Sequence, residues 1–162
     1  MANTKLEDLF LMTLRDIYHG ENQILSALPK MAAKASSSEL QDALKKHEME
    51  TAEQVNRLKQ VFEILGQPAT GEECEAIKGL IAEGEEVMSE IDTPEVCDAG
   101  IIAAGQAIEH YEMARYGTLA AWARELDMSE AADLLEETLE EEKMADETLT
   151  DIALSSVNRE AA

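Results

Sequence analysis

Apolar residues recur at spacings of three and four along most of this chain, a pattern that predicts amphipathic helices. Breaking and capping residues divide the pattern into five stretches, at about residues 4–35, 36–65, 70–91, 93–126 and 127–155. Four of the stretches are long and the third is shorter. The chain is also poor in aromatic residues, Gly and Pro, as helical proteins are. We therefore expect an all-α protein without strands of consequence.

Local signals mark where these helices begin. Three predicted starts have the capping-box spacing, namely Ser36 with Glu39, Thr70 with Glu73, and Asp127 with Glu130. Thr93 followed by Pro94 offers an N-cap and a proline at the first helical position. Pro29 lies inside the first stretch, where it is expected to kink or interrupt the helix.

The lengths of the connections predict how the helices are arranged. Very short turns around residues 35–38 and 126–129 make the flanking helices antiparallel neighbours. This gives two helical hairpins, at about residues 4–65 and 93–155, joined by a crossover with a short helix at about residues 67–92. The prediction is a single domain, residues 1–162, with the ferritin-like four-helix bundle fold. Five helices in some other array is the alternative.

Carboxylates interrupt the apolar stripe of every long helix near its middle. The polar residues on these stripes are Glu21, Glu50 with Gln54, Glu109 with Glu112, and Glu142 with Asp146. The mean position of Glu21 and Glu50 falls in the first turn, and that of Glu109 and Glu142 falls at the edge of the second. The members of each pair therefore lie level within their hairpin. Such a cluster in a low-dielectric interior requires cations or protons to neutralise it, and we favour metal ions.

The oxygen-rich set has the pattern of a di-iron or di-manganese carboxylate site, in which each helix supplies a Glu and two helices supply a second ligand. We predict two ions, iron or manganese, and no organic cofactor. His47 is either a ligand or a hydrogen-bond partner of a ligating carboxylate, and His110 is a surface or outer group. The acids that fall off the stripes are assigned to the solvated face, namely Glu53, Glu136, Glu137, Glu140 and Glu141. Salt bridges across the bundle are the alternative, but no basic residue lies on the inward stripes.

Charge and composition restrict the partners. The formal net charge is −22, from 35 acidic and 13 basic residues, and Lys and Arg do not cluster. Binding of nucleic acid is therefore not expected. No signal segment is visible, and no apolar run approaches the roughly 20 residues that span a bilayer. We expect a cytoplasmic protein that does not bind membranes, with reduced thiols at Cys74 and Cys97.

The start of the first helix is apolar around most of its circumference. The apolar residues there are Leu6, Leu9, Phe10, Leu11, Met12 and Leu14. A helix that buries only one side does not need so broad an apolar surface. It predicts contact with the crossover helix or with a second copy of the chain, so a homodimer is expected.

Several segments resemble a known family, the YciF-like stress proteins, a domain family of unknown function within the ferritin-like superfamily. The segments are LRDIYHGENQIL (14–25), HEMETAEQVNRLKQVFEILG (47–66), IAEGEEV (81–87), QAIEHYEMARYGTLA (106–120) and LLEETLEEEKMADETLTDIA (134–153). The resemblance implies a ferritin-like bundle, a dimer and a rubrerythrin-like di-metal centre, with Glu109 and Glu112 similar to the corresponding rubrerythrin pair. Ferritins and rubrerythrins usually carry histidine where this chain has Glu53 and Ala145, so Gln54 and Asp146 would have to substitute.

Two functions from different classes follow from these observations. The leading hypothesis is a stress-associated di-metal protein that reacts with a small oxidant, peroxide or dioxygen, through its metals. The alternative is a metal-free helical dimer that acts as a scaffold for protein partners. Iron storage in a cage is less favoured, because sharing the ferritin-like fold does not confer assembly.

Overall fold

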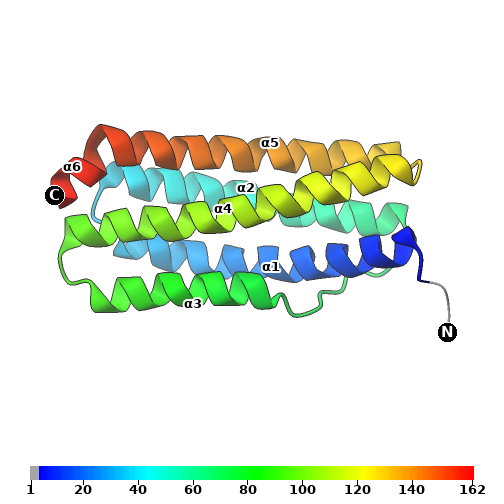
Figure 1. Ribbon diagram of the computed structural model, residues 1–162, viewed down its shortest axis with the longest axis horizontal. Helices are drawn as coiled ribbons and strands as arrows, with labels where there is room; N and C mark the ends of the chain where they lie inside the picture. Colours follow the sequence, from blue (N-terminus) through cyan, green and yellow to red (C-terminus); the bar gives the residue numbers. More distant parts are fainter. Residues whose placement is uncertain (1–3) are drawn as a thin grey trace.

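The computed structural model describes residues 4–162, and this part of the chain is almost entirely helical, without strands. Figure 1 shows the long helices lying side by side, with the shorter helix α3 (Glu75–Glu90) along one side of them. The elements in chain order are α1 (Leu6–Lys34), α2 (Ser38–Ile64), α3 (Glu75–Glu90), α4 (Pro94–Glu125), α5 (Ser129–Ile152), a π-helical turn (Ala153–Val157) and α6 (Asn158–Ala161). The predicted all-α fold is confirmed.

The long helices pair as two antiparallel hairpins, α1 with α2 and α4 with α5. The hairpins meet where α1 contacts α4 and α2 contacts α5. The crossover helix α3 packs against α1 and α4 on one side of the bundle (Figure 1). This is the predicted bundle of two hairpins with an extra helix in the crossover. Among the described residues, no helix has the length and hydrophobicity to cross a membrane.

The first turn is held by a buried carboxylate from the other hairpin. Asp98 on α4 is 2% exposed and accepts hydrogen bonds from the Ser36 amide at 2.8 Å, the Ser36 hydroxyl at 2.6 Å and the Ser37 amide at 2.8 Å. The hydroxyl of Ser37 accepts from the Leu40 amide and caps α2. The predicted cap at Ser36 was therefore wrong by one residue, because Asp98 takes the Ser36 hydroxyl.

The predicted capping box at Thr70 and Glu73 was also wrong, since α3 begins only at Glu75. The segment before α3 lies against α1, where the Glu72 amide donates to the Arg15 carbonyl at 3.2 Å. A Cβ on Gly71 would lie 2.9 Å from the Cβ of His19, so this close approach requires glycine. Contacts with α1, which the local sequence pattern does not contain, therefore hold these residues outside the helix.

The second turn differs from the prediction for a local reason. Asp127 has φ of 57°, a left-handed conformation that Asp tolerates better than most residues. It therefore belongs to the turn, α5 begins at Ser129, and a capping box from Asp127 was wrong. Thr93 and Pro94 begin α4 as predicted. Pro29 does not interrupt α1, which continues to Lys34.

The core has two hydrophobic clusters with a polar layer between them. One cluster, near the α4–α5 turn, includes Phe10, Leu58, Phe62, Leu119 and Leu135, and the other, near the α1–α2 turn, includes Leu28, Leu40, Ile77, Ile101 and Ile152. Full burial of a side chain of this size contributes about 1.5–3 kcal/mol. The buried polar residues of the layer are Glu21, His47, Thr51, Gln54, Glu109, Glu112, Thr138 and Glu142. The two clusters thus hold charged groups at mid-depth in the bundle.

Candidate metal centre

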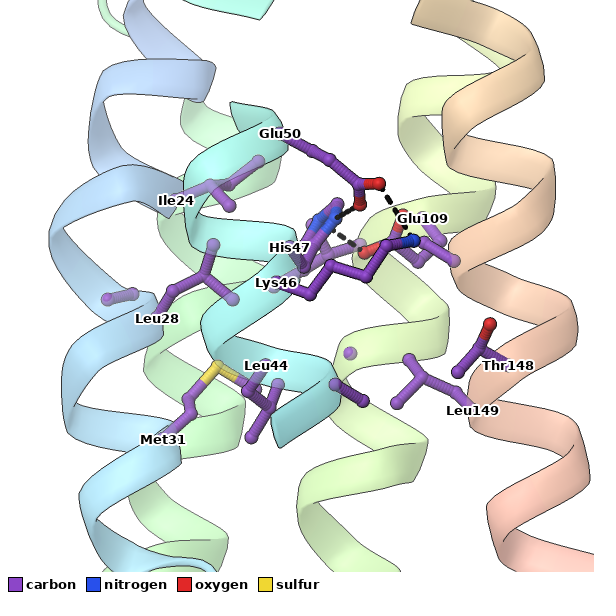
Figure 2. A pocket seen from close by; sticks show the side chains of 15 residues that line it. Ile24, Leu28, Met31, Leu44, Lys46, His47, Glu50, Glu109, Thr148 and Leu149 are labelled. Atoms are coloured by element: carbon purple, nitrogen blue, oxygen red, sulfur yellow. Dashed lines mark ion pairs between the residues drawn. The ribbon is translucent and has the colours of Figure 1, made fainter. Parts of the chain in front are cut away.

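Four buried residues of the polar layer form a compact cluster of groups that can bind a cation. They are His47 from α2, Glu109 and Glu112 from α4, and Glu142 from α5. Each offers one ligand atom, and these atoms all lie within 4.8 Å of one another. Glu109 and Glu112 share one face of α4 because residues three apart in a helix are neighbours. Figure 2 shows His47 and Glu109 reaching toward each other from facing helices.

His47 is surrounded by carboxylates. Its Nε2 lies 3.0 Å from Glu109 Oε1 and 3.9 Å from Glu142 Oε2, and its Nδ1 lies 3.8 Å from Glu50 Oε2. Neither ring nitrogen makes a well-directed hydrogen bond, so these contacts are ion pairs. Burial by itself lowers the pKa of His47, but the charge of Glu109 and the other acids outweighs it and raises that pKa well above its usual value. The surrounding carboxylates therefore favour the positively charged form of His47.

The acids of the cluster lack protein partners for their oxygens. Both oxygens of Glu112, both of Glu142 and Oε2 of Glu109 are buried without a hydrogen bond. Burial, followed by repulsion between the carboxylates, raises the pKa of Glu112 well above its usual value. Burial and neighbouring Glu109 do the same for Glu142. For Glu109 burial is again the largest effect and acts upward, but His47 outweighs it and the pKa is lowered. Each buried polar group left unpaired costs about 1–3 kcal/mol.

Glu21 brings a carboxylate from the remaining long helix. It is fully buried, Oε1 accepts a hydrogen bond from the Tyr116 hydroxyl, and Oε2 has no partner. Burial raises the pKa of Glu21 to about 7, although the bond from Tyr116 acts in the opposite direction. The charge of Glu21 in turn contributes to the raised pKa of Glu112. All four long helices thus supply groups to one polar layer.

Two further predicted ligands on α2 lie at the edge of this layer. The side chain of Glu50 is 23% exposed and its Oε1 lies 2.8 Å from Lys46 Nζ. Contacts with His47 and then with Lys46 lower the pKa of Glu50. Gln54 is fully buried, donates to Glu141 Oε2 at 3.1 Å and leaves its own Oε1 without a partner. Both residues border the cluster without belonging to its four members.

Asp146 lies in a separate set of contacts between α4 and α5. Its Oδ1 accepts from Gln106 Nε2 at 3.1 Å, and its Oδ2 lies 3.2 Å from Nε2 of the exposed His110. The structure therefore does not bring Asp146 into the four-residue cluster. Its role as a metal ligand stays a prediction. His110 lies at the surface, as predicted, with its side chain 65% exposed.

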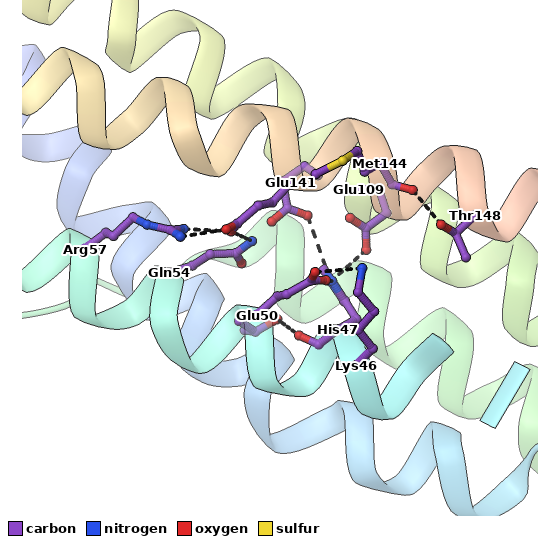
Figure 3. A network of polar contacts seen from close by, with 11 residues as sticks. Lys46, His47, Glu50, Gln54, Arg57, Glu109, Glu141, Met144 and Thr148 are labelled. Atoms are coloured by element: carbon purple, nitrogen blue, oxygen red, sulfur yellow. Dashed lines mark hydrogen bonds and ion pairs between the residues drawn. The ribbon is translucent and has the colours of Figure 1, made fainter. Parts of the chain in front are cut away.

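The assignment of Glu141 to the solvated face was wrong. Its two oxygens accept hydrogen bonds from Arg57 Nη1 at 2.7 Å and Arg57 Nη2 at 2.6 Å, as Figure 3 shows. The spacing could have indicated this, because Arg57 follows Gln54 by three residues and so shares its face of α2. The other off-stripe acids are exposed as predicted, namely Glu53, Glu136, Glu137 and Glu140.

The donor set fits a divalent cation. A cation would provide the partner that the buried oxygens of Glu112 and Glu142 lack, and it would offset the repulsion that raises their pKa values. Carboxylate oxygens with one imidazole suit iron and manganese, whereas soft thiolate sets suit zinc and copper(I). On α2 the order is His47-x-x-Glu50, the reverse of the Glu-x-x-His pair known from ferritin-like metal sites. The known pattern places the histidine after the glutamate, so the sequence alone did not decide whether His47 is a ligand or a hydrogen-bond partner of a ligand.

Comparisons with known proteins agree with this fold and identify a family. The family described as Domain of unknown function (DUF892) matches residues 5–162. Protein YciF of Escherichia coli K12 is 45% identical over 157 residues, which are 96% of this chain and 95% of that protein.

Solved structures of three proteins have folds similar to that of this chain. The crystal structure of the E. coli stress protein YciF has a TM-score of 0.92 at 44% identity, covering 96% of this chain and 99% of that one. YcfI from Rhodopseudomonas palustris, which has been proposed to be a structural protein, has a TM-score of 0.90 at 47% identity, covering 93% and 97%. A protein from Xanthomonas campestris has a TM-score of 0.74 at 22% identity, covering 98% and 100%, and shares the fold alone.

Proposed function

The chain belongs to the DUF892 family of YciF-like proteins, and we propose that it is a stress-associated protein that binds a di-iron or di-manganese carboxylate centre. The family is described without a function, so the proposal depends on the polar layer. The E. coli relative is called a stress protein, which supports a role in stress. The proposed centre reacts with a small oxidant, peroxide or dioxygen.

One observation carries the proposal. The buried oxygens of Glu112 and Glu142 have no hydrogen-bond partner. Glu142 Oε2 lies 3.9 Å from His47 Nε2. A fold that served only as a scaffold would be more stable with apolar or amide side chains at these positions, because unpaired buried carboxyls are costly. Retaining them in the core is expected when a cation supplies the missing partner.

The residues have distinct roles in this proposal. His47, Glu109, Glu112 and Glu142 would hold metal, and Glu21 would add a carboxylate from α1. When bound, iron or manganese supplies the electrons and the Lewis acidity for reaction with an oxidant. The Tyr116 hydroxyl donates to Glu21 and so keeps that carboxylate oriented.

Gln54 and Glu141 border the cluster on the side of Arg57, and their hydrogen bonds limit access of water to the cluster from that side. Glu50 lies one turn nearer to His47 on the same helix, and its partly exposed carboxylate can receive a cation from solvent. Asp146 remains an outer candidate, whose contact is with His110.

Glu112→Gln separates the proposal from a scaffold. The amide keeps the shape of the side chain and removes a buried carboxyl whose pKa is raised, so the metal-free variant should be at least as stable as the unaltered protein. It should also lose the rise in melting temperature that Fe(II) or Mn(II) gives the unaltered protein. Elemental analysis and thermal unfolding measure both effects, and Glu147→Gln at an exposed position of α5 is the matched control. Sub-stoichiometric metal in the unaltered protein, with no shift on adding metal or chelator, would refute the proposal.

The alternative is a metal-free dimer that acts as a scaffold. Leu9 and Met12 on α1 are 36% and 53% exposed, which offers an apolar contact surface. The proposed structural role of the R. palustris relative also favours this alternative. An absence of metal together with a stable dimer in solution would support it.

A further inference from the structure

An apolar pocket lies beside the carboxylate cluster. Figure 2 looks into this pocket, which is enclosed by α1, α2, α4 and α5. Leu28, Met31, Leu44 and Leu149 are among the apolar residues that line it, and His47 and Glu109 lie at one end. The pocket therefore connects hydrocarbon surface with two residues of the proposed metal centre.

Small side chains keep the pocket open. Ala43 and Ala145 line it, and so does Gly105, where a Cβ would lie 3.2 Å from Leu149 Cδ1. A larger side chain at any of these three positions would extend into the pocket and fill part of it. The space results from the choice of small residues on α2, α4 and α5.

The pocket reaches the surface between α2 and α5, where Lys46 and Thr148 are exposed. Beside this mouth, Lys46 Nζ lies 2.8 Å from Glu50 Oε1, one turn along the same helix. Both Lys46 and Glu50 are long side chains on the solvent side, so their movement can open the pocket without movement of the helices. The opposite side of the cluster is closed by the bonds of Arg57 with Glu141.

Size and lining restrict what the pocket accepts. Its volume is about 40 Å³, and a water molecule needs roughly 10–15 Å³ on the same scale. A molecule of a few atoms fits, and an alkyl chain does not. A polar molecule such as hydrogen peroxide would lose hydrogen bonds to water there, at a cost of roughly 2–7 kcal/mol per unpaired group. Away from Lys46, His47, Glu50 and Glu109 the lining is largely apolar, like that of cavities that stay dry and bind apolar ligands.

We infer that this pocket binds dioxygen and delivers it to the carboxylate cluster from the side of His47 and Glu109. The delivery step rests on the proposed metal centre, whereas binding of an apolar diatomic molecule in the pocket does not. The selected oxidant is thus dioxygen, because the apolar wall disfavours the hydrated peroxide.

Xenon tests the binding step without metal. Crystals of the metal-free protein held under xenon pressure are expected to show a xenon atom against Leu28 and Leu149. Ala145→Leu and Ala43→Leu should abolish it by filling the space. Ala107→Leu, the same change at an exposed position of α4, should keep it. Absence of xenon from the unaltered pocket would overturn the inference.

Oxidation rates test the delivery step. In protein loaded with Fe(II), Ala145→Leu should slow oxidation by dioxygen about tenfold, equivalent to about 1.4 kcal/mol. Anaerobic oxidation by hydrogen peroxide should stay at the rate of the unaltered protein, and Ala107→Leu should change neither rate. Ala43→Leu serves as the second variant if Ala145→Leu does not fold, as judged by its melting curve. Unchanged oxidation by dioxygen, or equal slowing with both oxidants, would overturn the inference. If the protein binds xenon but no metal, the proposed function is refuted, whereas the binding of a small apolar molecule in the pocket is supported.

Discussion

Arg57 on α2 and Glu141 on α5 form a two-point ion pair at the edge of the polar layer, with side chains that are only 14% and 18% exposed. Planar two-point pairing is the strong form of the Arg–carboxylate interaction. It joins the two hairpins next to Gln54, which also donates to Glu141. The pair therefore contributes to the bundle in a way that an exposed pair does not.

A double-mutant cycle with Arg57→Met and Glu141→Gln should measure this contribution. We expect a coupling free energy of about 1–2 kcal/mol from urea unfolding of the metal-free protein. The exposed pair of Lys30 and Glu85, with side chains 68% and 50% exposed, serves as the control. Its coupling should stay below about 1 kcal/mol. Equal coupling in the two cycles would contradict the prediction.

The metal-free protein should become less stable as pH rises from about 5 to about 8. The pKa of Glu21 is about 7 in the folded protein and about 4.3 in an unfolded chain. Between these values the folded state binds more protons, so the free energy of unfolding falls with pH, by at most about 1.4 kcal/mol per pH unit for each proton. The raised pKa values of Glu112 and Glu142 act in the same direction.

Urea unfolding at a series of pH values measures this slope. Glu21→Gln should reduce it, because the amide does not titrate. Adding Mn(II) should weaken or reverse the slope, since metal binding displaces protons from the ligands. A metal-free stability that rises through this pH range would show that the buried acids are ionised in the folded state.

Asp98→Ala should destabilise the protein by about 3 kcal/mol, because it removes the charged acceptor of three hydrogen bonds. Asp151→Ala, at an exposed position of α5, should change stability by less than about 0.5 kcal/mol. Chemical denaturation of both variants gives the comparison. A similar small effect for the two would mean that water replaces the Asp98 carboxylate at the first turn.

The homodimer remains a prediction, and the start of α1 is where it can be tested. Phe10 and Leu14 are fully buried within the chain, whereas Leu9 and Met12 stay exposed. If a second copy covers them, Met12→Glu should convert a dimer into a monomer in light scattering. Met144→Glu, at another exposed methionine, should leave the mass unchanged. A monomeric unaltered protein at micromolar concentration would refute the prediction.

The helices and their arrangement were predictable because each long helix carries its own period and each short turn limits its neighbours. Glu109, Glu112 and Glu142 could be assigned to the interior for the same reason, since they interrupt apolar stripes. Asp98 could not be assigned a role, because its partners Ser36 and Ser37 are distant in sequence. The start of α3 failed similarly, since residues near Gly71 are held by contacts with α1.

Within the site, the residues whose roles were hardest to predict lie at the border between the buried and the exposed face of a helix. His47 was left between two roles, and the structure places it 3.0 Å from Glu109. Glu141 was assigned to solvent because helical spacing defines the direction of a side chain only coarsely, and a long Arg can bind it there. Depth along a hairpin was easier to predict than angular position around a helix.

The hydrogen bonds of Asp98 span 61 or 62 residues and bind the turn of the first hairpin to the beginning of the second. During synthesis on the ribosome, α1 and α2 emerge well before α4, so the amides of Ser36 and Ser37 lack their Asp98 acceptor at that stage. The first hairpin consequently gains this constraint only after the chain has passed the crossover. The three hydrogen bonds to Asp98 can therefore form only after α4 has been synthesised and has packed against the first hairpin.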